Sequence, residues 1–358
     1  GVAYAPGDHK TVVRAGFGIY FDRIPLRATS NALQRDGSKY LVAQLAPTDS
    51  GAPAFPNVLA SLPANLPTRP NITRVDPNIK SSYSEQANLQ IERELPGGAS
   101  LSVGYLHLRG LHLILSRNVN VPTLTAAQAR AQGVANLGRP DPAWGNVSRF
   151  ESSGDSYYDG MIVSYNQRAT SWATLRASYT LSKSLDDSGN FFFSTPQDNF
   201  NLRGEKGLSD NDQRHRLTLS GTLEAPAGKG GGEGVRRALR GFQLSYIFSY
   251  ASRLPFNVVT GTDRNADTNN NDRPAGVGRN TGRGFSFQSL DLRLSRRFRL
   301  TERVGFETLV EGFNVLNRSN FAVPNNVFGA GAAPLATFGQ PTAAFDPRQV
   351  QVGLRLNF

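Results

Sequence analysis

The last eleven residues of the chain, Arg348 to Phe358, alternate between polar and apolar side chains without interruption. The apolar set consists of Val350, Val352, Leu354, Leu356 and Phe358. A period of two places alternate side chains on opposite faces of a β-strand. Strands of soluble sheets most often have about five or six residues, whereas a tilted strand needs about 9–11 residues to cross a bilayer. The segment therefore predicts a membrane-spanning strand that ends on an aromatic residue.

Nine further segments repeat this pattern, which gives about ten strands in all. They are residues 11–21, 83–94, 99–115, 157–168, 173–185, 214–224, 241–251, 287–298 and 303–316. One face of each strand is rich in Leu, Val and aromatics, and the other in Arg, Glu, Gln, Asn and Ser. The apolar face points to the core in a soluble sandwich or propeller, and to lipid in a membrane barrel with a wet lumen. Periodicity alone leaves both alternatives open.

The lengths of the connections separate the two alternatives. Long connections (22–82, 116–156, 186–213, 252–286 and 317–349) alternate with short ones (95–98, 169–172 and 299–302) and with the glycine-rich segment 225–240. Outer-membrane barrels have short periplasmic turns and long extracellular loops, whereas loops beyond about 12–15 residues are uncommon in soluble domains. The sequence therefore predicts an all-β fold, an antiparallel portion of a transmembrane β-barrel, with both termini on the periplasmic side.

Composition excludes several other classes of protein. No apolar run approaches 18 residues, so a membrane-spanning helix is excluded. The chain has no cysteine, which rules out disulfides, thiolate nucleophiles and zinc–thiolate sites. The net charge of +11 comes from basic residues that are scattered along strands and loops, with the densest cluster at 293–299. Nucleic-acid binding is not expected, because it favours a continuous basic stripe with stacking aromatics.

One loop has the spacing of a cation site. Asp263, Asn265, Asp267 and Asn269 stand at alternate positions, and Ca²⁺ prefers several oxygen ligands in such a spacing. The glycine usual at the sixth position is Thr268, however, and Pro274 stands where a glutamate would close the loop. The loop therefore has two interpretations: a structural Ca²⁺ site, or a solvated turn held by its own Asx side chains. We expect no other cofactor.

Aromatic residues near the presumed extracellular loops are candidates for a ligand-capturing mouth, with simple loop packing as the alternative. These candidates are Trp144, Tyr157, Tyr158, Phe191, Phe192 and Phe193. Several arginines on the polar strand faces (14, 176, 216, 293 and 355) could favour an anionic solute or pair with acidic residues within the barrel wall (92, 224, 291, 307 and 311). We expect the pairing, because charges inside barrels normally pair or stay wet. The four histidines are too scattered for a metal site, and no nucleophile, base and orienting group can be assembled. We expect no enzymatic activity.

Several segments, taken in order, resemble the C-terminal barrel of TonB-dependent outer-membrane receptors, in particular the Oar-like group. The matching stretches are TVVRAGFGIYFDR (11–23), SYSEQANLQIERELPGGASLSVGYLHLRGLHL (82–113), YDGMIVSYNQRA (158–169), TLRASYTLSKSLDD (174–187), GFQLSYIFSYASRLPFNV (241–258), SLDLRLSRRF (289–298), EGFNVLNRSNF (311–321) and VQVGLRLNF (350–358). They span almost the whole chain, and their order and spacing carry the resemblance.

The resemblance implies a barrel of about 22 strands closed around a plug. Residues 1–358 would then be the C-terminal part of one barrel domain, without the signal peptide, plug, TonB-contact segment and N-terminal strands, and we expect an open half-barrel sheet. The implied function is energised uptake of a scarce small solute across the bacterial outer membrane. The alternative is a surface or adhesion protein, or a passive porin. The implied partners are outer-membrane lipid, the TonB system and the barrel-assembly machinery, for which Phe358 would be the recognition signal.

Overall fold

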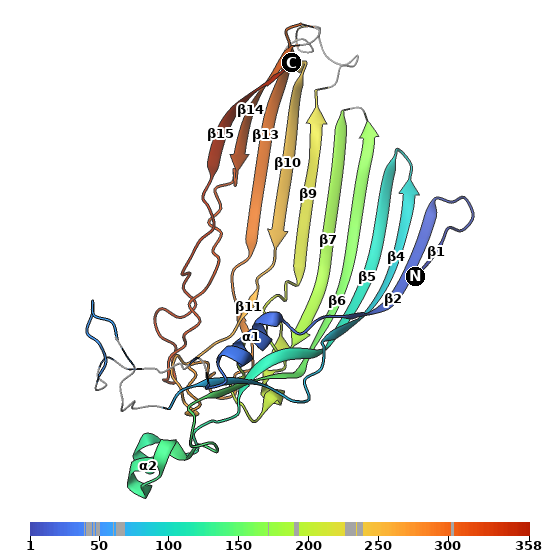
Figure 1. Cartoon of the computed structure of the whole chain (residues 1–358). Helices are drawn as coiled ribbons and strands as arrows, with labels where there is room; N and C mark the ends of the chain where they lie inside the picture. Colours follow the sequence, from blue (N-terminus) through green and yellow to red (C-terminus); the bar gives the residue numbers. More distant parts are fainter. Residues whose placement is uncertain are drawn as a thin grey trace.

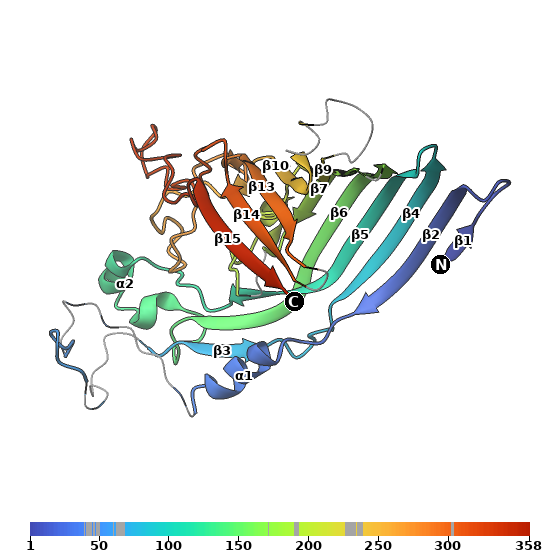
Figure 2. The same cartoon turned by 90° about the horizontal axis from the view of Figure 1, so that it is seen from above.

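A curved antiparallel sheet runs through the computed structural model, which describes residues 1–38, 40, 45, 47, 51–59, 61, 69–170, 172–189, 193–225, 234, 239–301 and 304–358 (Figures 1 and 2). Eleven of its 13 strands follow one another in sequence order. These strands are β1 (Val2–Tyr4), β2 (Thr11–Phe21), β4 (Tyr83–Leu95), β5 (Ala99–Asn118), β6 (Val147–Thr170), β7 (Ala173–Asp186), β9 (His215–Glu224), β10 (Phe242–Ala251), β13 (Phe287–Arg299), β14 (Gly305–Phe313) and β15 (Gln349–Asn357). All ten predicted strands are present, and the all-β prediction is confirmed.

The remaining elements are short and lie within the long connections. β3 (Ile72–Val75) pairs with β6 in parallel, β8 (Gly207–Leu208) pairs with β7, and β11 (Pro255–Phe256) pairs with β12 (Gly282–Arg283). The helices are α1 (Leu26–Gln34) and α2 (Ala126–Gln132), with 3-10 turns η1 (Ala135–Gly138) and η2 (Leu202–Glu205). None of the helices in the described ranges has the length and apolar character needed to span a bilayer.

The sheet is open, as the sequence predicts for a barrel portion. β1 and β15 are its two ends, and no pairing joins them in the part of the chain that the structure describes. Short connections lie at the end of the sheet that holds the C-terminus, and the long connections gather at the other end with α1 and α2 (Figure 1). The predicted alternation of short and long connections is therefore confirmed, with the two kinds at opposite ends of the sheet.

The apolar strand faces are not covered by a second layer of protein. One row of side chains crosses five neighbouring strands through the pairs Ile91–Val103–Val163–Tyr179–Leu217. Even inside the sheet such residues are open, with Ile91 47% and Val103 40% exposed. A soluble sandwich would bury this row against another sheet. The exposed apolar band instead matches the lipid-facing surface of an outer-membrane barrel.

The apolar core lies at the end of the sheet that carries the long connections, where α1 packs on the extended ends of β5 and β6. Ala28 of α1, Ile114 of β5 and Phe150 of β6 form a buried cluster, and Phe193 packs against it. Ile72 and Val147 are 2% and 1% exposed beside it. This core rests on β5 and β6, which extend beyond their neighbours at that end of the sheet (Figure 2).

Both bounds of one predicted connection are wrong for this reason, and the predicted strand 303–316 is also too long, since β14 ends at Phe313. The sequence indicates a loop over 116–156, but β5 continues to Asn118 and β6 begins at Val147. Residues 147–156 lack a clean alternation, so periodicity gives no strand signal there. Their strand conformation comes from pairing on both sides, with β3 on one edge and β5 on the other. The connection between the two strands is accordingly shorter, 119–146.

Candidate functional site

The polar strand faces form a charged wall opposite the apolar band. Arg14 of β2 pairs with Glu92 of β4 at 2.7 Å. Near the other edge of the sheet, Glu307 of β14 is 3% exposed. It lies 3.7–3.8 Å from the guanidinium groups of Arg293, Arg297 and Arg355. The predicted pairing of wall arginines with wall acids is thus confirmed for Arg14, Arg293 and Arg355. The contacts of Glu307 are longer than hydrogen bonds, and the attraction of several guanidinium groups offsets part of the cost of burying the carboxylate.

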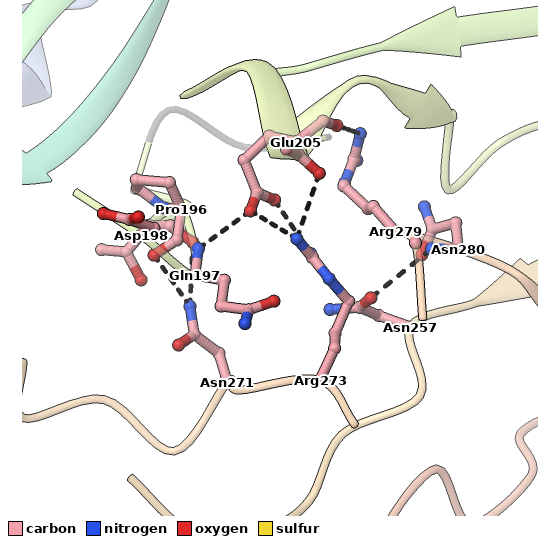
Figure 3. A network of polar contacts seen from close by, with 12 residues as sticks. Pro196, Gln197, Asp198, Glu205, Asn257, Asn271, Arg273, Arg279 and Asn280 are labelled. Carbon is pink, nitrogen blue, oxygen red and sulfur yellow. Dashed lines mark hydrogen bonds and ion pairs between the residues drawn. The ribbon is translucent and has the colours of Figure 1, made fainter. Parts of the chain in front are cut away.

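The long connections are joined by a buried ion pair, which Figure 3 shows at close range. Arg273, between β10 and β13, donates from Nη2 and Nη1 to the two carboxylate oxygens of Glu205 in η2, at 2.8 and 3.2 Å. Nη2 also donates to the Gly204 carbonyl at 3.1 Å, and Glu205 accepts from the Gln197 N–H at 3.0 Å. The paired side chains are only 6% and 8% exposed. This bidentate geometry fixes the β7–β9 connection against the β10–β13 connection.

A second arginine joins the same two connections. Arg279 donates to the side chain of Asp186, at the end of β7, and also to the Asp186 carbonyl at 3.0 Å and the Glu205 carbonyl at 3.3 Å. Asp210 lies 3.6 Å from the Arg279 guanidinium. Both arginines come from one connection, and their acceptors come from the other connection and from the end of β7, so the two connections fold as one unit.

A polar cavity of about 270 Å³ lies between these connections. Its wall includes Asp187, Gln197, Asn257, Asn271, Arg273 and Asn280. Burial raises the pKa of the Asp187 carboxyl above its ordinary value, and the hydrogen bond that it accepts from the Asp155 N–H offsets this only in part. The cavity is close to the lower end of the usual range for ligand pockets, about 300–1,000 Å³.

The Asx-rich loop lies beside this unit, and its side-chain oxygens accept hydrogen bonds from the loop itself and from Asn199 of the β7–β9 connection. Asp263 accepts from the N–H groups of Asp267 and Thr268 at 3.2 and 2.8 Å. Asp267 accepts from the Asn269 N–H at 2.9 Å and from Nδ2 of Asn199 at 2.7 Å, while Asn265 accepts from the Asp267 N–H at 3.0 Å. Burial, with neighbouring carboxylates, raises the pKa of Asp267. The two interpretations of this loop, a Ca²⁺ site and a turn held by its own Asx side chains, both stay predictions.

The candidate aromatic residues do not gather in one place. Trp144 is half-buried against Gly37, and Phe193 packs on Phe150 with ring centroids 5.5 Å apart. Tyr157 and Tyr158 are neighbours inside β6, so their side chains point to opposite faces of the sheet. Phe191 and Phe192 lie outside the described residues. A capture role for this set stays a prediction.

The histidines take part in isolated contacts. His107 Nδ1 lies 2.8 Å from Asp159 on the apolar side of the sheet, and His215 Nδ1 lies 2.8 Å from the Tyr179 hydroxyl. Across the described ranges, no group of three or more His, Asp or Glu side chains is arranged to hold a metal ion.

Sequence reasoning missed the residues that organise this region. Glu205, Arg273 and Arg279 stand in long polar connections where charged residues are common, and Asp186 ends β7. The partners are 68 to 93 positions apart. Local patterns carry no signal for such pairs. Only the fold of the two connections brings them together.

The comparisons with known proteins agree with the geometry of the sheet. A family model described as an outer membrane beta barrel domain matches residues 1–278 and 275–351. The chain belongs to this family. It is therefore an outer-membrane barrel domain, and its apolar band faces the lipid of the bacterial outer membrane. No curated protein matches the chain.

Solved structures of larger barrels share the fold of this outer-membrane barrel domain. The transporter YddB of Escherichia coli has a TM-score of 0.57 at 10% identity, covering 98% of this chain and 39% of YddB. A variant of PfeA, the ferric enterobactin receptor of Pseudomonas aeruginosa, has a TM-score of 0.55 at 13% identity, covering 99% and 39%. FpvA of the same species, bound to a ferric pyoverdine, has 0.50 at 13%, covering 99% and 32%. The domain thus resembles TonB-dependent receptors and spans about a third to two fifths of their length.

Proposed function

We propose that this barrel domain belongs to a TonB-dependent receptor of the Oar-like group, which imports a scarce solute across the outer membrane with energy from the TonB system. The observation that carries the proposal is the shared strand arrangement of YddB, PfeA and FpvA, together with long connections gathered at one end of the sheet. In such a receptor the barrel supplies the pore wall, and its long connections meet the solute first.

The charged wall supports a role as a conduit. Its acids neutralise its arginines in part: Arg14 pairs with Glu92, whereas three arginines surround Glu307, with Glu311 as a second acid 3.6 Å from Arg293. A wall lined with charged side chains stays wet. We expect selection of the solute to fall to the long connections.

Growth on limiting nutrients tests the proposal. The strain that carries the gene is compared with a strain lacking the gene and with a strain lacking TonB, on siderophore-bound iron, cobalamin, oligosaccharides and peptides, each as the limiting source. We expect one class of solute to fail in both mutant strains. Re-introducing the gene should restore growth only where TonB is present.

Two results would contradict the proposal. Loss of growth that depends on the gene but not on TonB would indicate a passive porin. No growth defect on any solute, together with loss of cell attachment in the strain lacking the gene, would indicate an adhesion protein.

A further inference from the structure

A cluster of arginines lies at the end of the sheet that carries the short connections, where β10 and β14 begin and β13 and β15 end (Figure 1). Short connections of outer-membrane barrels face the periplasm. A cavity of about 800 Å³ opens there, and its described wall contains four arginines and no acidic residue. The members of this arginine cluster are Arg240, Arg296, Arg297 and Arg299. Three of them belong to the densest basic segment of the sequence, 293–299.

The arginine cluster is accessible from outside the protein. Arg240 and Arg299 are exposed, and the side chain of Arg297 is 70% exposed. Only Arg296 is half-buried. A ligand can therefore reach the cluster without a rearrangement of the strands.

The positive charge of the arginine cluster is largely uncompensated. Three of its members form no ion pair with a described residue, and the fourth, Arg297, lies 3.8 Å from Glu307. Glu307 is 3% exposed and is shared with two other arginines of the wall. Like charges around one opening raise the local concentration of anions. The cluster therefore favours an anionic partner.

Arg296 ends the lipid-facing row of β13. Leu290, Leu292 and Leu294 precede it at alternate positions, so all four side chains lie on one face of the strand. Leu294 is 45% exposed and belongs to the apolar band that meets lipid. The next position on this face lies at the depth where the hydrocarbon of the bilayer gives way to the lipid headgroups.

Aromatic rings contact Arg296 at the same depth. Its Cζ lies 4.7 Å from the centroid of the Phe242 ring and 4.8 Å from that of Phe298. Phe298 stacks in turn on Phe306, with ring centroids 4.6 Å apart. Aromatic girdles mark both membrane interfaces of outer-membrane barrels, and cation–π contacts hold a guanidinium group in place. The arginine cluster therefore lies at the periplasmic interface of the bilayer.

Phospholipid headgroups supply the anion at this depth. A guanidinium group can donate to two phosphate oxygens at once, and basic pockets at membrane interfaces bind anionic headgroups. The headgroup of phosphatidylethanolamine would place an ammonium group among the arginines, and the described wall has no acidic residue to accept from it. The glycerol headgroup of phosphatidylglycerol carries no positive charge. The charges of the wall thus select an anionic phospholipid over a zwitterionic one.

We propose that the arginine cluster binds the phosphate of an anionic phospholipid, of the phosphatidylglycerol and cardiolipin class, in the periplasmic leaflet of the outer membrane. The cavity receives the headgroup, and the acyl chains lie along the leucine row of β13. This interaction with the membrane goes beyond the proposed uptake function and does not depend on it.

Lipid binding to the protein purified in a neutral detergent tests the inference. Native mass spectrometry measures the affinities of phosphatidylglycerol and cardiolipin, and of phosphatidylethanolamine and phosphatidylcholine with the same acyl chains. We expect the two anionic lipids to bind at least tenfold tighter than either zwitterionic lipid. Inorganic phosphate and a hexaglutamate peptide are added as competitors, and neither should displace the lipid at tenfold excess.

Two double variants locate the binding. Arg240→Gln with Arg299→Gln removes two exposed charges that form no ion pair with a described residue, so the fold should be kept while phosphatidylglycerol binds at least tenfold more weakly. The control is Arg253→Gln with Arg283→Gln, which removes two exposed arginines at the end of the sheet that carries the long connections. Both variants have the same net charge. The control should change the affinity less than twofold.

Several results would overturn the inference. Zwitterionic lipids could bind as tightly as anionic ones, or the cluster variant could bind phosphatidylglycerol no more weakly than the control does. Displacement by inorganic phosphate would indicate a site for a soluble anion, and displacement by hexaglutamate would indicate an acidic protein segment as the partner. Heat-modifiable gel mobility checks the folding of both variants, and the lipid preference of the unaltered protein tests the inference without any variant.

Discussion

Removal of one partner from the buried Arg273–Glu205 pair should loosen both connections that it joins. In Glu205→Gln, the amide oxygen can keep the contacts of Oε1 with the Gln197 N–H and with Nη2, but the Arg273 guanidinium loses its counter-charge. Because the arginine side chain is only 6% exposed, solvation by water replaces little of the lost attraction. Breaking such a pair typically costs about 3–5 kcal/mol.

Hydrogen exchange of backbone amides measures this cost locally. A loss of about 3–5 kcal/mol speeds exchange through local opening by roughly two to four powers of ten. We expect this change in the peptides of residues 193–214 and 252–286, with no change in the spanning strands. The control is Arg74→Gln, which removes an exposed ion pair with Asp141 at 3.8 Å. Exposed pairs contribute less than about 1 kcal/mol, so its exchange should change less than roughly fivefold.

A double variant tests the physical reason. Glu205→Gln combined with Arg273→Met removes both charges, and replacing a buried pair by neutral groups is often nearly neutral. The double variant should therefore exchange more slowly than Glu205→Gln alone. The reasoning is refuted if the double variant exchanges as fast as Glu205→Gln or faster. It is also refuted if the exchange rate of Glu205→Gln is within about fivefold of that of the unaltered protein.

Three other perturbations give separate tests. Val103→Lys, on the lipid-facing side of β5, should destabilise the barrel by about 2–4 kcal/mol, whereas Ser102→Lys on the polar face should have a smaller effect; heat-modifiable mobility in lipid vesicles compares them. The Asp187 carboxyl, whose pKa is raised mainly by burial and further by Asp155 and Asp186 against the lowering effect of Arg279, binds its proton more tightly in the folded chain. The β7–β9 connection should therefore become more stable as the pH falls from neutral towards 3.8, the ordinary pKa of an aspartate. Asp187→Asn should remove this pH dependence. The measurement is hydrogen exchange of the backbone amides, corrected for the intrinsic exchange rate at each pH. Because the carboxylates of loop 263–272 accept N–H groups of the loop itself, millimolar Ca²⁺ should leave its exchange unchanged, and protection by Ca²⁺ would instead support the calcium interpretation.

The sequence by itself determined the strands that cross the membrane. The predicted bounds of β2 agree with the structure at both ends, and those of β4, β9 and β10 differ by one residue. Prediction from strict alternation succeeds there because each side chain faces either lipid or water, and its polarity follows from which of the two it faces. The alternation of short and long connections likewise gave the direction of the sheet, since a meander returns to the same side at every second link.

Only the tertiary structure decided what the long connections do. The extension of β6 back to Val147 depends on β3, which is more than 70 positions earlier in the chain. The partnership of Arg273 with Glu205, and the cavity beside it, depend on two connections that fold against each other. Outside the bilayer neither lipid nor a repeating pattern constrains the side chains. Their conformation is set by long-range hydrogen bonds and ion pairs, which leave no periodic trace in the sequence.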